Sequence, residues 1–326
     1  MKALITGITG FVGGWLAEHL LECGDQVLGC SQSGRWLPTS AAGPMQQVPL
    51  VRFSLSDDEG LPDAEYQHIA AFAPDCIYHL AGVAHAHRCG PAGKVSASAW
   101  EVNVQGTQRV AELARRLPSA PRVLFVSSSY VYPAGTVNDL PVSEDAPPNP
   151  RGGYGLGKLA AEQHLLSAAA AGQLDCVIAR AFQHTGPRQG PAYMLPTWAW
   201  QCSRASQRPI WAYNTQARVD VCDVRDVVQA YRLLAKKGTT ATVYNVGSGV
   251  PRVAGVILAR LLELAGTRRT TRSLRTVAKF DPIANPSRLA ACTGWRPQIP
   301  LDQTLIDTYE YWRGRRLRRE RGEKSR

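Results

Sequence analysis

The N-terminus places a short apolar strand, a glycine-rich turn and an apolar helix in immediate succession. Residues 2–6 (KALIT) form the strand, the turn has the spacing G-x-x-G-x-x-G at Gly7, Gly10 and Gly13, and the helix covers Trp15 to Leu21. In such a turn the first glycine permits the bend, the second lets the backbone approach a phosphate, and the third lets helix and strand pack closely. The helix N-terminus favours a pyrophosphate. This order predicts an α/β fold with a doubly wound parallel sheet.

A tyrosine and a lysine four residues apart form the second feature. Tyr154 and Lys158 point the same way if residues 151–171 are helical. A phenol in water titrates near pH ~10, so it exchanges protons poorly at neutral pH unless a fixed cation favours its phenolate. Lys158 would be that cation and would lower the pKa of Tyr154. By itself, the spacing is more typical of an exposed pair on an amphipathic helix.

A cluster of hydroxyl groups follows the apolar run 122–126 (RVLFV), which has the composition of a buried strand. Ser127, Ser128 and Ser129 would therefore lie where a parallel strand ends. Ligands bind at that edge of open α/β sheets. The serine cluster and the glycine turn together favour a catalytic role for the tyrosine and lysine pair over the surface alternative.

These motifs, in this order and over 326 residues, resemble the extended short-chain dehydrogenase/reductases of the NAD-dependent epimerase/dehydratase family. Within that family the chain is most similar to the GDP-4-keto-6-deoxy-D-mannose reductases and the GDP-mannose 4,6-dehydratases, from Met1 to about Arg313. The resemblance implies that Ser128, Tyr154 and Lys158 are the catalytic residues. It also implies that the lysine holds the nicotinamide ribose.

The length and the resemblance predict a chain in two parts. With 326 residues, 44% of them hydrophobic, the chain can bury a complete α/β core and a smaller lobe. We expect a Rossmann-like dinucleotide-binding domain over residues 1–181, to which residues 219–247 return. Residues 182–218 and 248–313 would form a smaller C-terminal substrate-binding lobe. A basic tail, residues 314–326, would follow it.

The loop after the second predicted strand bears on the choice of cofactor. An acidic residue there bonds the ribose 2′-hydroxyl of NAD, whereas a basic one accommodates the 2′-phosphate of NADP. The loop contains Arg35 and no acid, which favours NADP(H) and leaves NAD(H) as the alternative. The residues that the turn and the resemblance imply for the cofactor are Gly7, Gly10, Phe11, Val12, Gly13, Arg35, Leu55, Leu80, Ala81, Gly82, Tyr154 and Lys158.

Residues 180–189 (RAFQHTGPRQ) resemble the R-P-F-N-H-x-G-P-G-Q segment of the reductases, with Gln183 in place of the asparagine and Arg188 in place of a glycine. His85 aligns with a histidine of the related dehydratases. Arg218 lies one position before the arginine that meets the diphosphate in the family. The residues that the resemblance implies for a nucleotide-sugar substrate are His85, Ser129, Gln183, Arg188, Arg218 and Arg275.

The residues that follow Ser128 bear on the reaction. In 4,6-dehydratases one or both of the next two positions hold acids that move protons at C5 and C6, whereas here they are Ser129 and Tyr130. Neither is a carboxylic acid at neutral pH. We therefore expect NADPH-dependent reduction of the C4 ketone of a nucleotide-activated 4-keto-6-deoxyhexose, such as GDP-4-keto-6-deoxy-D-mannose to GDP-D-rhamnose. The alternative is a nucleotide-sugar 4-epimerase or 4,6-dehydratase with retained NAD(P).

Composition sets limits on partners and location. The net charge of +11 owes much to residues 313–326, where eight Lys and Arg face two Glu, and a solvated helix end explains this segment without nucleic acid. A regulatory or RNA-associated role on a reductase-like fold is the alternative from another class.

Eight scattered cysteines without C-x-x-C indicate reduced thiols in the cytoplasm and no metal site. No apolar run in the sequence is long enough to span a membrane. The resemblance implies a homodimer through the long helices at 97–117 and 151–171.

Overall fold

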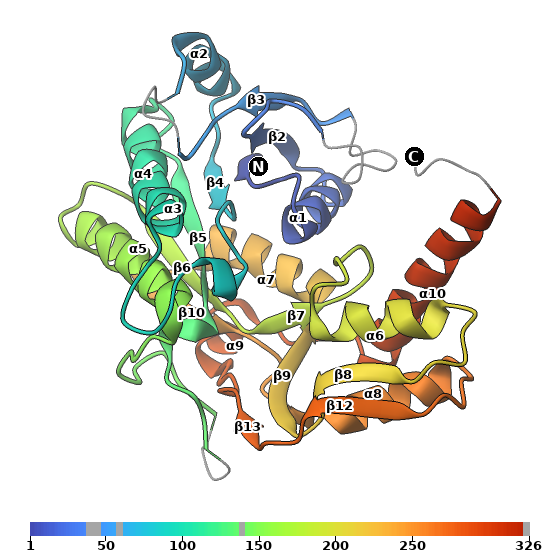
Figure 1. Ribbon diagram of the computed structural model, residues 1–326. Coiled ribbons are helices and arrows are strands. Elements are labelled where there is room, and N and C mark those ends of the chain that lie inside the picture. Colours follow the sequence, from blue (N-terminus) through green and yellow to red (C-terminus); the bar gives the residue numbers. More distant parts are fainter. Residues whose placement is uncertain (37–46, 57–60, 137–140, 322–326) are drawn as a thin grey trace.

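A parallel sheet of seven strands forms the centre of the larger domain (Figure 1). The computed structural model describes residues 1–36, 47–56, 61–136 and 141–321. The strand order is β10-β6-β5-β4-β1-β2-β3, so the direction of winding reverses between β1 and β4, and ligands bind at such a switch point. In this order the strands are β10 (Thr242–Val246), β6 (Cys176–Ala181), β5 (Arg122–Ser128), β4 (Cys76–His79), β1 (Lys2–Thr6), β2 (Gln26–Ser31) and β3 (Leu50–Arg52).

Helices cover both faces of this sheet (Figure 1). Successive side chains of a strand point to opposite faces, so Ala3 and Ile5 of β1 join the core beneath α1 and α7, whereas Leu4 joins the core on the other face. Each fully buried leucine or isoleucine stabilises the fold by about 1.5–3 kcal/mol. The predicted doubly wound α/β sheet is confirmed. The covering helices are α1 (Phe11–Glu22), α2 (Asp63–Phe72), α4 (Gly106–Arg116), α5 (Gly152–Ala170) and α7 (Val224–Lys237).

The long helix predicted at 97–117 is interrupted by a π-helical turn. It consists of α3 (Ala97–Trp100), the π turn Glu101–Gln105 and α4. The Thr107 hydroxyl donates a hydrogen bond to the Asn103 carbonyl at 2.8 Å within this stretch. Single π turns inside helices occur frequently at functional sites. This one presents Asn103 to the loop that follows β4.

The smaller lobe combines two small sheets with three helices (Figure 1). Its core contains Trp198, Leu258 and Leu305, one from each of the helices α6, α8 and α10. Three further short segments pack on the larger domain: η2 (Ala86–Arg88) and η4 (Ser129–Val131) contact α5, and α9 (Ser287–Thr293) contacts α7 and β10. The elements of the lobe are β7 (Gln183–Thr185), α6 (Met194–Ser203), β8 (Ile210–Asn214), β9 (Ala217–Asp223), β11 (Pro251–Val253), α8 (Ala254–Leu264), β12 (Thr271–Arg275), β13 (Lys279–Phe280) and α10 (Leu301–Glu320).

The structure bears on two predicted boundaries. The chain was expected to return to the larger domain at residue 219, but β9 still pairs with β7, β11 and β13 of the lobe, so the return begins with α7. The basic segment from residue 314, expected to be a solvated helix end, continues α10 as far as Glu320. Within the described ranges, no helix is both long and apolar enough to cross a bilayer.

Candidate active site

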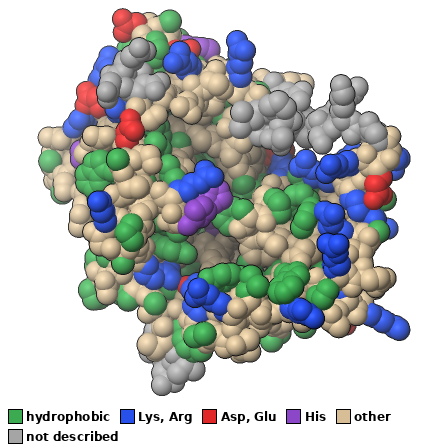
Figure 2. Space-filling view, in the orientation of Figure 1, with side chains coloured by type: hydrophobic (Ala, Val, Ile, Leu, Met, Phe, Trp, Pro, Cys, Tyr) green, Lys and Arg blue, Asp and Glu red, His purple; other side chains and the backbone are tan. Residues whose placement is uncertain are grey.

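The glycine turn after β1 lines a cavity of about 840 Å³. Gly7 has a φ of +74°, and a Cβ on it would lie 2.8 Å from the Ala81 backbone nitrogen. α1 begins directly after Gly10, and the first N–H groups of a helix have no partner within it. A cradle without side chains at a helix N-terminus fits the pyrophosphate of a dinucleotide. Figure 2 shows the hollow in the middle of this face, with histidine and Lys or Arg side chains at its border.

The loop after β4 forms another wall of this cavity. Leu80, Ala81 and Gly82 line it, next to the glycine turn. Asn103 holds the loop, because its Oδ1 accepts the Val83 N–H at 2.7 Å and its Nδ2 donates to the Val83 carbonyl at 3.2 Å. The π turn therefore has a structural role in shaping the predicted cofactor site.

Ser128, Tyr154 and Lys158 meet at a second cavity of about 190 Å³, which all three line. β5 ends at Ser128, and α5 brings the tyrosine and the lysine to the same place. The Ser128 Oγ accepts the Tyr130 N–H at 3.2 Å, and the Ser128 hydroxyl shares a hydrogen bond with Tyr154. Lys158 Nζ donates to the Val126 carbonyl at 2.9 Å. The structure thus brings the three predicted catalytic residues together.

Burial controls the protonation of this group. It raises the pKa of Tyr154 above its ordinary value, against the hydrogen bond from Ser128, which lowers it. Burial also lowers the pKa of Lys158 from 10.5 to about 8, although the Glu162 carboxylate acts in the opposite direction. We predicted that Lys158 would lower the pKa of Tyr154, but burial dominates and the shift has the opposite sign. Tyr154 is therefore a neutral acid at neutral pH.

An aromatic and cationic stack adjoins Tyr154. The rings of Tyr130 and Tyr154 meet edge to face with centroids 5.5 Å apart, and the Arg151 guanidinium carbon lies 4.2 Å from the centre of the Tyr130 ring. Arg151 in turn forms an ion pair with Asp281 at 2.7 Å. The sequence did not single out Arg151 or Asp281, since they lie 130 positions apart. Ser129, predicted to touch substrate, is buried and lines the smaller cavity.

Two of the predicted substrate residues line the larger cavity. His85, from the loop after β4, stacks on Tyr193 of the smaller lobe with ring centroids 5.5 Å apart, and both residues line the cavity. Gln183 lines both cavities, and its Nε2 donates to Asp281 at 2.8 Å. The site is therefore built from both parts of the chain. Tyr193 lies in a loop, and no sequence pattern pointed to it.

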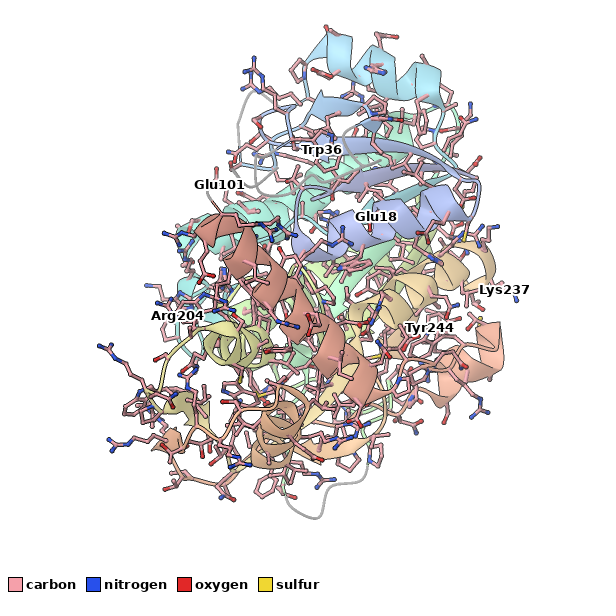
Figure 3. The ribbon with its side chains drawn as sticks, turned by 90° about the vertical axis from the view of Figure 1, so that its right-hand side faces the viewer. Glu18, Trp36, Glu101, Arg204, Lys237 and Tyr244 are labelled. Carbon is pink, nitrogen blue, oxygen red and sulfur yellow. The ribbon has the colours of Figure 1, made fainter. Side chains whose placement is uncertain are left out.

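Arg188 is absent from the described residues that line the two cavities. Its guanidinium forms a bidentate ion pair with Glu18 of α1, with both N–O distances at 2.7 Å, and lies 3.6 Å from the Trp15 ring centre. Figure 3 shows Glu18 on α1. Arg188 has a φ of +74°, a conformation that favours glycine, which is the residue found here in the reductases. In this structure the Arg188 side chain joins the lobe to α1, and its contact with substrate stays a prediction.

The two other predicted arginines lie on strands of the smaller lobe, and the described lining of the two cavities does not include them. Arg275 is exposed at the end of β12, with its guanidinium carbon 5.3 Å from the centre of the Tyr213 ring. Arg218 pairs through its backbone with Val253 and Phe280 in the sheet around β9. Contacts of these arginines with a diphosphate stay predictions.

Two predicted cofactor residues also lie outside the described lining. Leu55 is buried against α4, where a Cβ on Gly106 would lie 2.8 Å from the Leu55 Cβ. Arg35 is exposed in the loop after β2, near Gln32, which lines the larger cavity. Arg52 of β3, which the sequence did not single out, adjoins this loop and packs beside Gly34. The position of Arg52 beside this loop follows from the pairing of β2 with β3, so it can be predicted only once the strand order of the sheet is known.

The sequence matches the NAD dependent epimerase/dehydratase family over residues 3–247. It is 26% identical over 323 residues to the GDP-6-deoxy-D-mannose reductase of Pseudomonas aeruginosa, covering 96% of this chain and 98% of that protein. It is 29% identical over 342 residues to the UDP-glucose 4-epimerase of Mycolicibacterium smegmatis, covering 97% and 99%. The solved structure of RMD from Pseudomonas aeruginosa complexed with NADPH has a TM-score of 0.80 to this chain at 26% identity, covering 96% of this chain and 99% of that one. The chain therefore belongs to the NAD dependent epimerase/dehydratase family of extended short-chain dehydrogenase/reductases, and it is an enzyme that uses a nicotinamide dinucleotide.

Proposed function

We propose that the protein is an NADPH-dependent reductase of the C4 ketone of a nucleotide-activated 4-keto-6-deoxyhexose. The substrate would be GDP-4-keto-6-deoxy-D-mannose and the product a GDP-6-deoxyhexose such as GDP-D-rhamnose. The main support for this proposal comes from the two residues that follow Ser128. They are Ser129 and Tyr130, neither has a carboxylic acid, and both line the smaller cavity. Dehydration needs an acid and a base at C5 and C6, which these side chains do not supply at neutral pH. The similarity to a GDP-6-deoxy-D-mannose reductase supports the GDP-sugar.

The three catalytic side chains have separate tasks in this reaction. When bound, NADPH supplies the hydride for C4. Tyr154, kept protonated by burial, donates its proton to the C4 oxygen as negative charge develops there. The Ser128 hydroxyl donates a hydrogen bond to the same oxygen. Lys158 stabilises the charge left on the tyrosine oxygen and hydrogen-bonds the nicotinamide ribose.

The cofactor preference rests on the loop after β2. Arg35 is exposed there, and a guanidinium binds phosphate oxygens through well-oriented N–H groups. A reductase must exchange its cofactor at every turnover, whereas the epimerases of this family retain theirs. The solved structure of RMD with NADPH supports the same choice.

One assay tests the proposal. Purified protein is mixed with NADPH and enzymatically prepared GDP-4-keto-6-deoxy-D-mannose, and the absorbance of the reduced nicotinamide is followed. We expect a stoichiometric loss of NADPH and the appearance of a GDP-6-deoxyhexose, with the C4 configuration read by NMR. No loss of NADPH, together with NAD(P) bound to the protein as isolated, would instead favour the 4-epimerase or 4,6-dehydratase alternative.

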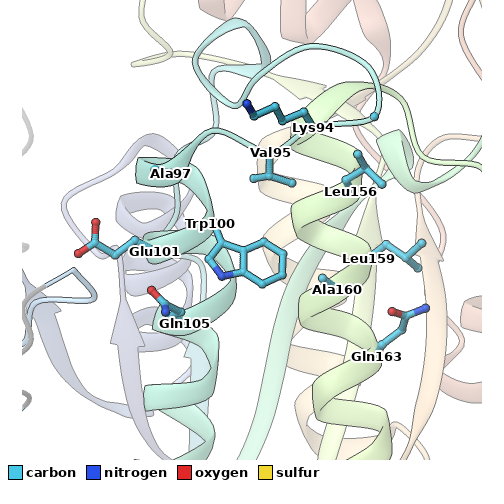
Figure 4. Close-up of a pocket in the computed structure, with 11 residues that line it drawn as sticks. Lys94, Val95, Ala97, Trp100, Glu101, Gln105, Leu156, Leu159, Ala160 and Gln163 are labelled. Carbon is cyan, nitrogen blue, oxygen red and sulfur yellow. The ribbon is translucent and has the colours of Figure 1, made fainter.

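We also propose that the enzyme is a homodimer through α3, the π turn and α5. A groove of about 840 Å³ lies between these helices, and Trp100 points into it beside Leu156, Leu159 and Ala160 (Figure 4). Trp100 is 45% exposed, which is unusual for so large an apolar side chain unless a partner covers it. A second copy related by a two-fold axis would bury the same face on both subunits.

A cytoplasmic location is the last part of the proposal. All eight cysteines are free thiols, and six of them are buried. Free thiols persist in reducing compartments. The nicotinamide dinucleotide and nucleotide sugar would be drawn from the same compartment.

A further inference from the structure

A buried carboxylate from the smaller lobe lies beside the active site. Asp281, which follows β13, is 6% exposed. It accepts hydrogen bonds from Arg151 Nη1 at 2.7 Å, from Gln183 Nε2 at 2.8 Å and from Lys279 Nζ at 3.1 Å. Its own N–H donates to the Arg218 carbonyl at 3.0 Å. A single carboxylate thus connects the lobe to the start of α5 and to a residue that lines both cavities.

The contact with Asp281 sets the orientation of the Gln183 amide. An ionised carboxylate only accepts hydrogen bonds, whereas an amide has a donor end and an acceptor end. Gln183 must therefore turn its NH₂ group to Asp281, which leaves its carbonyl oxygen for a ligand in the cavity. The smaller cavity also contains Ser128 and Tyr154. The carbonyl is thus placed for the sugar, because the sugar must bring its C4 oxygen to the same two side chains.

The second partner of Asp281 supports the opposite wall of that space. Arg151 directly precedes α5 as its N-cap residue, three positions before Tyr154, and its guanidinium lies over the Tyr130 ring at 4.2 Å. The charge of Asp281 keeps the guanidinium there. Loss of the carboxylate would therefore loosen both the Gln183 amide and the Tyr130 ring.

We propose that Asp281 is a positioning residue for sugar recognition, which holds the Gln183 carbonyl as the acceptor for a hydroxyl group of the hexose. This inference rests on the proposed function, since it assumes a nucleotide sugar. It also predicts specificity, because a sugar that carries a carboxylate at this point would meet an acceptor and an unfavourable negative charge. In the reductases that the chain resembles, an asparagine occupies the place of Gln183, and its shorter side chain would place the amide differently.

Equilibrium binding tests the inference without turnover. Calorimetry in the presence of NADP⁺ measures the affinity of the protein for GDP-D-mannose, UDP-D-glucose and dTDP-D-glucose. The affinity for the corresponding free nucleoside diphosphate is measured in the same way. The ratio of the two affinities measures the contribution of the sugar. For the nucleotide sugar that binds, Asp281→Asn should reduce this ratio about tenfold, since one hydrogen bond to the sugar is lost. Affinities for the free diphosphate and for NADPH should stay unchanged.

Two further variants separate positioning from a general structural role. Lys279→Met removes another contact of the same carboxylate, and since Lys279 is largely exposed the ratio should stay at the wild-type value. Gln183→Glu should lower the ratio by placing two carboxylates together. The double variant Gln183→Glu with Asp281→Asn reverses donor and acceptor, keeps the net charge and should recover most of the ratio.

The outcomes distinguish this inference from the proposed function. An Asp281→Asn protein with the wild-type ratio, or a double variant no better than the poorer single variant, would overturn the positioning role. A wild-type protein that binds no nucleotide sugar more tightly than the free diphosphate would overturn it too. The proposed reductase activity would still be judged by NADPH consumption alone.

Discussion

The ring of Tyr130 meets the ring of Tyr154 edge to face, with the two planes at 75° and the centroids 5.5 Å apart. This geometry is the favourable one for two aromatic rings. It places an aromatic wall where the related dehydratases carry an acid. The phenol proposed to donate the proton is therefore supported on one side by a ring and held on another by the Ser128 hydroxyl.

Replacing Tyr130 tests the importance of that wall. Tyr130→Ala should lower kcat/KM about tenfold, because an aromatic pair contributes roughly 0.5–1.5 kcal/mol beyond its buried area and Tyr154 would lose its support. Tyr130→Phe keeps the ring and should retain at least half of the activity. Steady-state kinetics with saturating NADPH measure both. If the phenylalanine variant were as impaired as the alanine variant, the hydroxyl rather than the ring would matter.

Tyr154→Phe tests the proton donor directly. The variant removes one oxygen from a buried position and leaves the glycine turn untouched. We expect NADPH affinity within about twofold of wild type and a loss of at least a hundredfold in kcat, since general acid catalysis contributes roughly 10²–10⁴-fold. Fluorescence titration and steady-state kinetics measure the two quantities. Equal turnover in both proteins would contradict the assignment.

Lys158→Met should abolish turnover yet stabilise the fold at neutral pH. Burial lowers the pKa of Lys158 to about 8, so below that pH the native protein holds a buried ammonium at a cost of about 3 kcal/mol. The methionine removes this cost but leaves the Val126 carbonyl without its donor, which costs about 1 kcal/mol. The expected net gain in the free energy of unfolding is about 2 kcal/mol at pH 7, measured by urea denaturation.

The sign of the pH dependence follows from proton binding. Between pH 8 and 10.5 the unfolded wild-type chain binds more protons at this lysine than the native protein does, so wild-type stability rises with pH in that window. The advantage of Lys158→Met should therefore shrink as the pH rises from 8 toward 10.5. Lys237→Met, on the exposed end of α7, is the matched surface variant for this comparison. A variant less stable than wild type at pH 7 would refute the argument.

Arg35→Ala tests the choice of cofactor. A charge-assisted hydrogen bond contributes roughly 1.5–3 kcal/mol, so the KM for NADPH should rise between about tenfold and a hundredfold. The KM for NADH, which lacks the 2′-phosphate, should stay within about twofold. Arg52→Ala, beside the same loop, is the matched comparison. A loss of NADPH preference in the Arg52 variant alone would transfer the phosphate contact to that residue.

The motifs that could be predicted from the sequence are those whose geometry is local. The spacing of Tyr154 and Lys158 fixes their common direction on a helix, and an apolar run that ends in serines places Ser128 at a strand end. Gly7 and its neighbours form a turn whose conformation depends on a few consecutive residues. These elements carry the predicted catalytic group and the predicted cofactor cradle.

The contacts that escaped prediction connect distant parts of the chain. Arg188 meets Glu18 across 170 positions, a pairing that no local pattern around either residue indicates. Asp281 meets Gln183 across 98 positions. The pKa of Tyr154 was predicted with the wrong sign, because i, i+4 spacing reports a neighbouring charge but not the depth of burial.

Trp100→Glu tests the proposed dimer. Placing a carboxylate from each subunit in an apolar contact costs several kcal/mol when neither finds a partner, so the variant should sediment as a monomer at micromolar concentration while the wild-type protein sediments as a dimer. Trp211→Glu is the matched control, because Trp211 on β8 is 44% exposed, nearly the same as Trp100, but lies on the smaller lobe. Sedimentation velocity distinguishes the two states. If Trp211→Glu dissociated the protein and Trp100→Glu did not, the interface would lie on the β8 and β12 sheet instead.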